Sequence, residues 1–286
     1  MSKRTILWVI NPHSGEGERD WVFTLLAQKA QKHIYRTKGE KDQDSISDLL
    51  NNHSPDFVVA GGGDGTIKMV ATLLIGQHTP LGILPLGSAN GLATELEITM
   101  DIQSLILSYI YDDLQHSQLD AILINNEHYC FHISDLGLNA RIVSGFEEQT
   151  VRGFLGYGLS ALSQLKTDDL IFTVEVGGQT LETMMVFFAN ARKYGTGVII
   201  NPNGNLSDGK FEIGILKEVN LRLVGQLLFE TGSEPDPEAL EIRSTKEITL
   251  HTKKPVELQI DGEYVGKVTS LTAKIIPKKI NLVLSC

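Results

Sequence analysis

The strongest chemical signal in the sequence is a glycine-rich loop that carries a carboxylate, Gly61-Gly62-Gly63-Asp64-Gly65-Thr66. Glycines allow positive φ angles and let a ligand approach the backbone closely. Exposed N–H groups at the start of a helix attract phosphate. The simpler interpretation is a glycine turn in which Asp64 caps the following helix. Three glycines followed by Asp-Gly-Thr are more specific than an isolated pair, and they favour a phosphate site.

Two familiar phosphate-binding motifs do not fit this loop. The sequence contains no G-x-x-x-x-G-K-[ST], so it is not a P-loop protein. Gly61, Gly63 and Thr66 do not complete G-x-G-x-x-G, and the loop follows a later strand rather than the first. A dinucleotide dehydrogenase is therefore not expected.

Two other polar loops follow predicted strands. Residues 11–15 come after the apolar run 5–10, and residues 85–91 come after the run 81–84. Each loop alone is an ordinary strand-ending turn. Ligands of open α/β sheets bind beyond the carboxyl ends of the strands, where all three loops would meet. Their convergence predicts a nucleotide site.

Carboxylates also occur in two later turns. Asp261-Gly262-Glu263 follows the predicted strand 256–260, and Asp-Gly is the strongest two-residue hairpin signal. Asp208 belongs to the polar loop 205–210, where an Asx-type turn is the simpler interpretation. From the residues alone, both segments are turns.

The elements that position these loops change in type along the chain. Up to residue 118, apolar strands alternate with amphipathic helices, which predicts a parallel sheet covered on both faces. From residue 119, short strands separated by Asn-Gly, Gly-Gly and Asp-Gly turns predict an antiparallel sandwich or barrel. One helical stretch, 153–165, interrupts them. Two domains, 1–118 and 119–286, are predicted.

Composition narrows the class of protein. A net charge of −10 argues against nucleic acid as the main partner, and it weakens whole-surface attraction to an anionic membrane. The apolar run near the amino terminus ends at Asn11-Pro12, too short for a signal peptide or a membrane span. Cys130 and Cys286 form no metal-ligand pattern. A reduced, cytoplasmic protein is expected.

The motifs, taken together and in order, resemble the diacylglycerol kinase catalytic-domain family, which includes sphingosine and ceramide kinases and bacterial lipid kinases. The resemblance covers nearly the whole chain. It rests on residues 11–15, 62–66, 85–90, 190–197, 201–202, 207–211 and 261–263. It implies an α/β nucleotide domain, with a parallel sheet as in NAD kinase, followed by an antiparallel β-sandwich. The active site is then expected between the two domains.

The chemistry that this resemblance implies is transfer of the γ-phosphoryl group of ATP to the hydroxyl of a lipid alcohol, such as diacylglycerol or a sphingoid base. Such a reaction needs Mg²⁺, positioning and a base near the hydroxyl. Asp64 is the expected carboxylate for catalytic Mg²⁺. The residues expected to contact ATP are Asn11, Pro12, His13, Ser14, Gly15, Thr37, Gly62, Gly63, Asp64, Gly65, Thr66 and Ser88.

The resemblance also assigns roles to the later turns. Glu263 becomes the expected general base, with Asp261 as a supporting carboxylate or an alternative base. Asp208 is expected to hold a structural Mg²⁺, with Asn205 and Lys210 as backbone carbonyl donors. Three positions depart from the family pattern: Lys68 replaces a common asparagine, Gly91 replaces an acidic residue, and Ser88 replaces threonine.

Alternatives to a lipid kinase stay open at this point. An NAD kinase-like or phosphofructokinase-like enzyme uses a related Gly-Gly-Asp-Gly loop, and Lys68 and Gly91 would suit a non-catalytic nucleotide- or lipid-binding protein. A lipid substrate requires at least transient contact with a membrane surface, although no anchor is visible. A homodimer is left open by the sequence.

Overall fold

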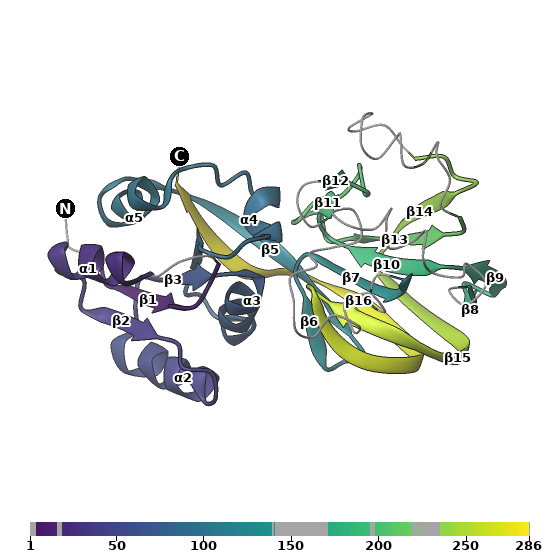
Figure 1. The fold of residues 1–286 in the computed structure, drawn as a ribbon, viewed down its shortest axis with the longest axis horizontal. Coiled ribbons are helices and arrows are strands. Elements are labelled where there is room, and N and C mark those ends of the chain that lie inside the picture. The colour runs from purple at the N-terminus through teal and green to yellow at the C-terminus, as the bar shows by residue number, and fades with distance from the viewer. Residues whose placement is uncertain are drawn as a thin grey trace. The chain divides into compact units, whose positions relative to one another are not determined.

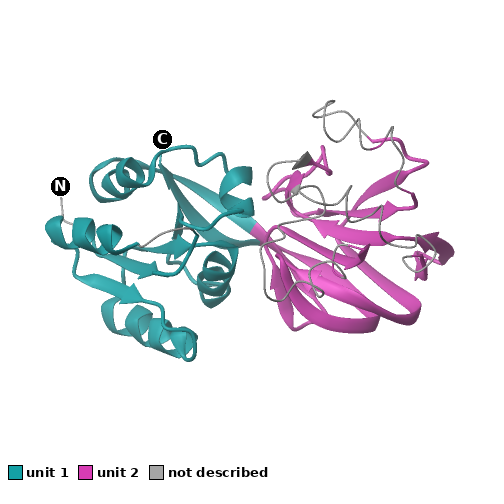
Figure 2. Cartoon of the chain, in the orientation of Figure 1, with its two compact units in different colours: residues 1–119, 278–286 teal, residues 120–277 magenta. Residues whose placement is uncertain are grey.

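The computed structural model describes residues 4–15, 19–138, 140, 171–194, 198–218, 223 and 235–285. The chain divides into two compact units, Met1–Leu119 with Lys278–Cys286 and Asp120–Pro277 (Figure 2). The sequence placed all of 119–286 in the second domain, whereas the segment 278–286 belongs to the first unit. The helix predicted for 153–165 lies outside the described residues.

The first unit is built on a parallel sheet of the strand order β4-β3-β1-β2, of which β1, β2 and β3 are labelled in Figure 1. Leu282, near the end of β16, pairs in parallel with Leu81, the first residue of β4. The strands are β1 (Ile6–Ile10), β2 (His33–Arg36), β3 (Phe57–Gly62), β4 (Leu81–Pro85) and β16 (Glu263–Ser285). Every residue of β1 is buried, as expected of a parallel strand covered on both faces.

Helices cover this sheet. They are α1 (Asp20–Gln28), α2 (Asp42–His53), α3 (Asp64–Leu73), α4 (Gly91–Glu95) and α5 (Ile102–Tyr111). Alternate residues of β1, such as Trp8, share one apolar cluster with residues of α1 and α5, and Tyr109 of α5 is a member. The Tyr109 hydroxyl accepts from the Ile83 N–H and donates to the Ile83 carbonyl, both at 3.0 Å. α5 is thereby fixed to β4, the strand that leads into the loop 85–91.

The second unit is an antiparallel β structure with the strand order β14-β13-β10-β7-β15-β16. Its strands are β5 (Leu114–Ile124), which starts in the first unit, β6 (His128–Cys130), β7 (Ile133–Gly137), β8 (Phe172–Val176), β9 (Gln179–Thr183), β10 (Met185–Ala189), β11 (Lys193–Tyr194), β12 (Val198–Ile199), β13 (Phe211–Leu216), β14 (Leu240–Thr245), β15 (Glu247–Ile260) and part of β16. The parallel and antiparallel parts confirm the predicted order of fold types.

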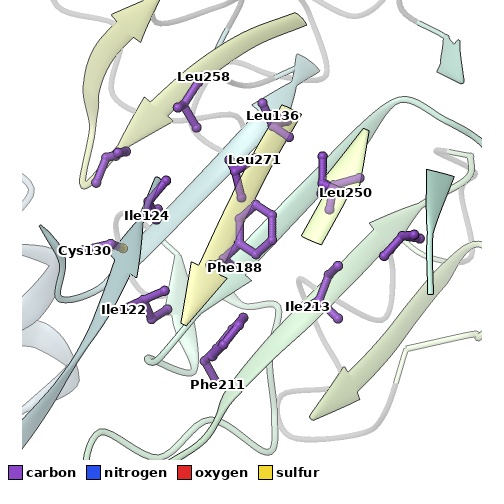
Figure 3. Packing of buried hydrophobic residues seen from close by; sticks show 14 of the residues in the cluster. Ile122, Ile124, Cys130, Leu136, Phe188, Phe211, Ile213, Leu250, Leu258 and Leu271 are labelled. Atoms are coloured by element: carbon purple, nitrogen blue, oxygen red, sulfur yellow. The ribbon is translucent and has the colours of Figure 1, made fainter. Parts of the chain in front are cut away.

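Apolar side chains cover both faces of the central strand β10. Val186 and Phe188 belong to one cluster, and Figure 3 shows Phe188 there together with Phe211 and Leu258. The alternate residue Phe187 belongs to a second cluster. This period of two places one core on each side of the strand. Among the residues that the structure describes, no helix has the length and apolar character needed to cross a membrane.

Candidate functional site

The loops after β1, β3 and β4 are joined at the carboxyl ends of these strands. The Asn11 N–H donates to the Gly61 carbonyl at 2.8 Å, and the Leu86 and Gly87 N–H groups donate to the Gly62 carbonyl at 3.0 and 3.2 Å. The backbone pairing of the sheet therefore continues into the loops. The expected convergence of these three loops is present within the first unit.

Side chains tie the first loop to the glycine-rich loop. The Asn11 Nδ2 group donates to Thr66 Oγ1 at 3.3 Å, and the Gly63 N–H donates to Ser14 Oγ at 3.2 Å. Within its own loop, Asn11 Oδ1 accepts from the His13 N–H at 2.9 Å. The Thr66 N–H also donates to the Gly63 carbonyl at 3.0 Å, so Asn11, Ser14, Gly63 and Thr66, all expected to contact ATP, form one bonded group.

The glycines in these loops allow close packing. A Cβ on Gly62 would lie 2.4 Å from Thr66 Oγ1, and a Cβ on Gly87 would lie 2.4 Å from the Gly63 Cα. Gly15 has a φ of +71°, and a Cβ there would lie 2.4 Å from the Leu86 carbonyl oxygen. Because real Cβ atoms do not approach so closely, the loops require glycine for contact with one another.

Asp64 is the first residue of α3 and follows the cap residue Gly63. The cap position is therefore Gly63, and Asp64 lies in the first helical turn instead of at the cap that the simpler interpretation supposed. A carboxylate in the first helical turn interacts favourably with the positive end of the helix dipole. Asp64 is partly exposed beside the bonded loops, where its oxygens suit a hard cation.

The loop after β2 begins beside the end of β1, because the Thr37 N–H donates to the Ile10 carbonyl at 3.0 Å. The buried Asp42 carboxylate holds this loop by accepting from the Lys38 and Gly39 N–H groups and from the Tyr35 hydroxyl at 2.8 Å. Burial alone would raise the pKa of Asp42, but these donors outweigh it and hold the pKa below its ordinary value.

Ser88 and Asn90 lie in the loop between β4 and α4. Ser88 is exposed, and Asn90 has a φ of +50° and donates from Nδ2 to the Gly87 carbonyl at 2.8 Å. Asn90 Oδ1 is buried and has no hydrogen-bond partner among the described residues. This oxygen is an acceptor beside Gly87, and a donor such as metal-bound water would satisfy it.

In the second unit, Asp261 and Gly262 form the two-residue turn between β15 and β16. Both have positive φ, 53° and 85°, as a type I′ hairpin requires. The Asp261 carboxylate accepts from the N–H groups of Phe131 at 3.1 Å and His132 at 3.0 Å, and from the Cys130 thiol at 3.2 Å. Asp261 therefore anchors the hairpin to the segment after β6.

A second contact fixes the other side of this turn. The Gly262 N–H donates to Gln259 Oε1 at 2.7 Å, and Gln259 Nε2 donates to the Asp135 carboxylate. Gln259 and Asp135 are 2% and 0% exposed, so this network is held inside the unit. Glu263 is exposed on the same hairpin, in register with Ile260.

The loop 201–210 has the predicted Asx turn, in which Asp208 Oδ1 accepts from the Lys210 N–H at 2.9 Å. Asn205 Oδ1 accepts from the Ser207 N–H at 3.0 Å. The buried Asp120 joins the loop through Gly209 N–H···Oδ2, at 2.7 Å. No cluster of three or more His, Cys, Asp or Glu side chains suited to a metal occurs in the described part of the chain. A cation here would need backbone carbonyls and water in addition to the Asp208 carboxylate.

Two fully buried amides, Asn201 at the start of this loop and Asn190 beside it, lie near Asp120 and Glu212. Asn190 donates from Nδ2 to the Asp120 carbonyl, and Asn201 donates from Nδ2 to Glu212 Oε2, both at 2.9 Å. The Oδ1 atoms of both asparagines have no partner among the described residues, and burial raises the pKa of Glu212. Oxygen acceptors with unmet hydrogen-bonding capacity beside the loop suit a hydrated cation.

The predicted residues thus form a group in each unit. The residues expected to contact ATP lie in the first unit. The expected general base and the expected ligands of the structural metal lie in the second unit. Sequence reasoning missed several residues that hold these groups in place. They are Arg19, Asp42, Asp120, Cys130, Asp135 and Gln259. Arg19 donates to the carbonyls of two loops, and no motif marks such a contact.

Comparison with known proteins gives consistent results along the chain. Residues 5–121 match the family model of the diacylglycerol kinase catalytic domain, and residues 134–284 match that of the YegS C-terminal NAD kinase beta sandwich-like domain. A protein of Alcanivorax borkumensis named "Probable lipid kinase YegS-like" is 27% identical over 224 residues, covering 74% of this chain and 73% of that protein. One of the same name from Yersinia pestis is 29% identical, covering 74% of each.

A solved structure supports the fold. A diacylglycerol kinase from Bacillus anthracis superimposes with a TM-score of 0.73 at 18% identity, covering 100% of this chain and 98% of that one. The predicted α/β domain followed by a β-sandwich is therefore confirmed. The two matches occur in the expected order and together span nearly the whole sequence. The chain belongs to the diacylglycerol kinase catalytic-domain family, with a C-terminal domain of the YegS type.

Proposed function

We propose that this protein is an ATP-dependent kinase that transfers the γ-phosphoryl group to the hydroxyl of a lipid alcohol, such as diacylglycerol or a sphingoid base. The observation that carries the proposal is the bonded group of loops at the start of α3, in a chain of this family. The names of the relatives supply the lipid class.

In this proposal the loops after β1, β3 and β4 hold the triphosphate, with Ser88 and Thr37 beside them. The amino-terminal N–H groups of α3 would face the phosphate oxygens. Asp64 would hold Mg²⁺, which neutralises charge on the phosphates when bound. Lys68 lies one helical turn after Asp64, and in this proposal its ammonium group adds positive charge near the phosphates.

On the acceptor side, Glu263 is the proposed general base. Its carboxylate takes the proton of the lipid hydroxyl, the hydroxyl oxygen bonds to the γ-phosphorus, and the bond from that phosphorus to the bridging oxygen of ADP breaks. Asp261 already accepts from two N–H groups and a thiol, which suits an anchor better than a base. Exposed Glu263 is better placed to receive a proton.

The loop 201–210 is the proposed place of a structural Mg²⁺. Asp208 would supply a carboxylate oxygen, and Asn205 and Lys210 would supply backbone carbonyls. The unpartnered oxygens of Asn190 and Asn201 nearby support a hydrated ion. In this proposal the protein is cytoplasmic, contacts a membrane surface transiently and has no nucleic acid partner.

The experiment is a panel of acceptors with labelled ATP and Mg²⁺. It contains diacylglycerol, monoacylglycerol, phosphatidylglycerol, sphingoid bases, NAD and fructose 6-phosphate. Phosphorylation of a lipid that is lost in Asp64→Asn and kept in Asp44→Asn supports the proposal. Asp44 is a matched control because it is also an acidic residue in the first turn of a helix of the same unit. Turnover of NAD or fructose 6-phosphate instead would identify the related small-molecule kinases, and ADP binding without any turnover would identify a non-catalytic protein.

A further inference from the structure

Arg19 connects two of the loops that surround the start of α3. It precedes α1, and its side chain is half-buried. Its Nε donates to the Ser14 carbonyl and its Nη2 donates to the Leu86 carbonyl, both at 3.0 Å. Ser14 belongs to the loop after β1 and Leu86 to the loop after β4, so one guanidinium group bonds both.

This pair of bonds completes a closed set of contacts. The loop after β3 is bonded to the loop after β1 through Ser14 and to the loop after β4 through the Gly62 carbonyl. Arg19 supplies the remaining connection, between the first and the last of these loops. Tight packing surrounds it, because a Cβ on Gly15 would lie 2.7 Å from Arg19 Nη2.

The chemistry of the side chain suits this position. A guanidinium group has five N–H donors in a rigid plane, so it can bond two carbonyls in different directions, whereas an ammonium group is a compact point charge. Its permanent positive charge also lies beside the loops that are proposed to bind ATP, which is highly anionic. Hydrogen bonds from charged donors are stronger than those from neutral donors.

We propose that Arg19 is a positioning residue that sets the spacing of the phosphate-binding loops. The inference rests on the proposed function, because it takes these loops as the site of ATP. Replacement of Arg19 relaxes the loops, so that ATP binds more weakly while Asp64 and Glu263, the groups assigned to the chemistry, are unchanged. The replacement therefore raises the KM for ATP more than it lowers kcat.

The test compares Arg19→Met and Arg19→Lys with Arg4→Met. Arg4 is a matched control because it is also half-buried in the first unit and donates from Nη1 to a backbone carbonyl, that of Tyr109, at 3.1 Å. Titration calorimetry gives the Kd of MgATP, steady-state kinetics give KM and kcat, and thermal unfolding gives Tm. We expect Arg19→Met to raise Kd and KM roughly tenfold, Arg19→Lys to recover part of the loss, and Arg4→Met to change only Tm.

The outcomes separate this inference from the proposed function. Wild-type protein that binds no ATP overturns both. If wild-type protein binds ATP and Arg19→Met binds it equally well, the role of Arg19 is overturned and the kinase proposal stands. Equal losses of Tm and of ATP affinity in Arg19→Met and Arg4→Met also overturn it, because they show only a general contribution to stability. If Arg19→Met fails to fold, the Kd and the KM-to-kcat comparison for Arg19→Lys decide.

Discussion

The two carboxylates of the Asp261-Gly262-Glu263 hairpin should be separable by mutation. Asp261→Asn keeps the size of the side chain but removes its charge and one acceptor oxygen. The wild-type carboxylate accepts from two N–H groups and one thiol. Hydrogen bonds to charged groups each contribute about 1.5–3 kcal/mol. An amide can still satisfy one or two of the three donors, so we expect a loss of roughly 2–4 kcal/mol in the free energy of unfolding.

Glu263→Gln should behave in the opposite way. Glu263 is exposed, and surface substitutions usually change the free energy of unfolding by no more than about 0.5 kcal/mol. Loss of a general base, by contrast, costs about 10²–10⁴-fold in rate. Glu247→Gln, an exposed glutamate at the start of β15, is the matched control and should keep both stability and rate.

The assay is urea unfolding followed by circular dichroism, combined with kcat for the lipid acceptor identified by the panel. The expected pattern is a large stability loss in Asp261→Asn, a large rate loss in Glu263→Gln, and neither in Glu247→Gln. Asp261→Asn with wild-type stability would contradict the anchoring role derived from its three donors. Glu263→Gln with wild-type kcat would remove Glu263 as the base.

Three other predictions follow from the first unit. Gly87→Ala places a Cβ 2.4 Å from the Gly63 Cα, so we expect lower stability by about 1–3 kcal/mol in chemical unfolding, together with weaker ATP binding. Tyr109→Phe leaves the N–H and carbonyl of Ile83 without their buried partner, and should lower the free energy of unfolding by about 1–3 kcal/mol with little change in KM. Asp42 has a folded-state pKa below its unfolded value, so its contribution is present above about pH 4 and is lost as pH falls through the folded pKa.

Each of these has an outcome that would contradict it. Wild-type stability in Gly87→Ala would mean that the loops move apart without cost. A large change in KM for Tyr109→Phe would mean that α5 acts on the site and not only on the core. For Asp42, acid unfolding is compared with that of Asp42→Asn, and the two stability curves should converge at low pH. Curves that stay parallel would contradict the hydrogen-bonded carboxylate.

Much of the fold could be predicted from the sequence because the signals are local. The continuous apolar run that forms β1 and the helical spacing after Asp64 show directly which residues are buried. The Asp-Gly pair predicted its hairpin because type I′ geometry requires positive φ at both positions. The return of 278–286 to the first unit could not be predicted, since it depends on pairing between Leu282 and Leu81, far apart in the chain.

The residues of the candidate site also fall into two groups, those that the sequence predicts and those that it does not. Residues predicted to contact a ligand through short motifs, such as Asn11 and Asp64, are visible in the sequence as a pattern. Residues that hold those motifs in place are not, because their partners are backbone atoms at large sequence separation. Arg19 bonds the carbonyl of Leu86, and the N–H of His132 bonds Asp261. Any residue type can supply a backbone carbonyl, and any except proline can supply an N–H, so such pairs leave no mark on composition or spacing.

The glycines show why a motif alone does not decide between a ligand site and a packed turn. Gly62 and Gly87 are required by contacts within the protein, since a Cβ at either position would lie 2.4 Å from a neighbouring residue. The same glycines would be needed if no phosphate ever bound. What distinguishes the site is that three loops and the start of α3 come together, with Asp64 beside them. Because packing and ligand approach both require small residues here, a substitution such as Gly87→Ala should impair stability and ATP binding together, whereas Asp64→Asn should impair turnover with little change in stability.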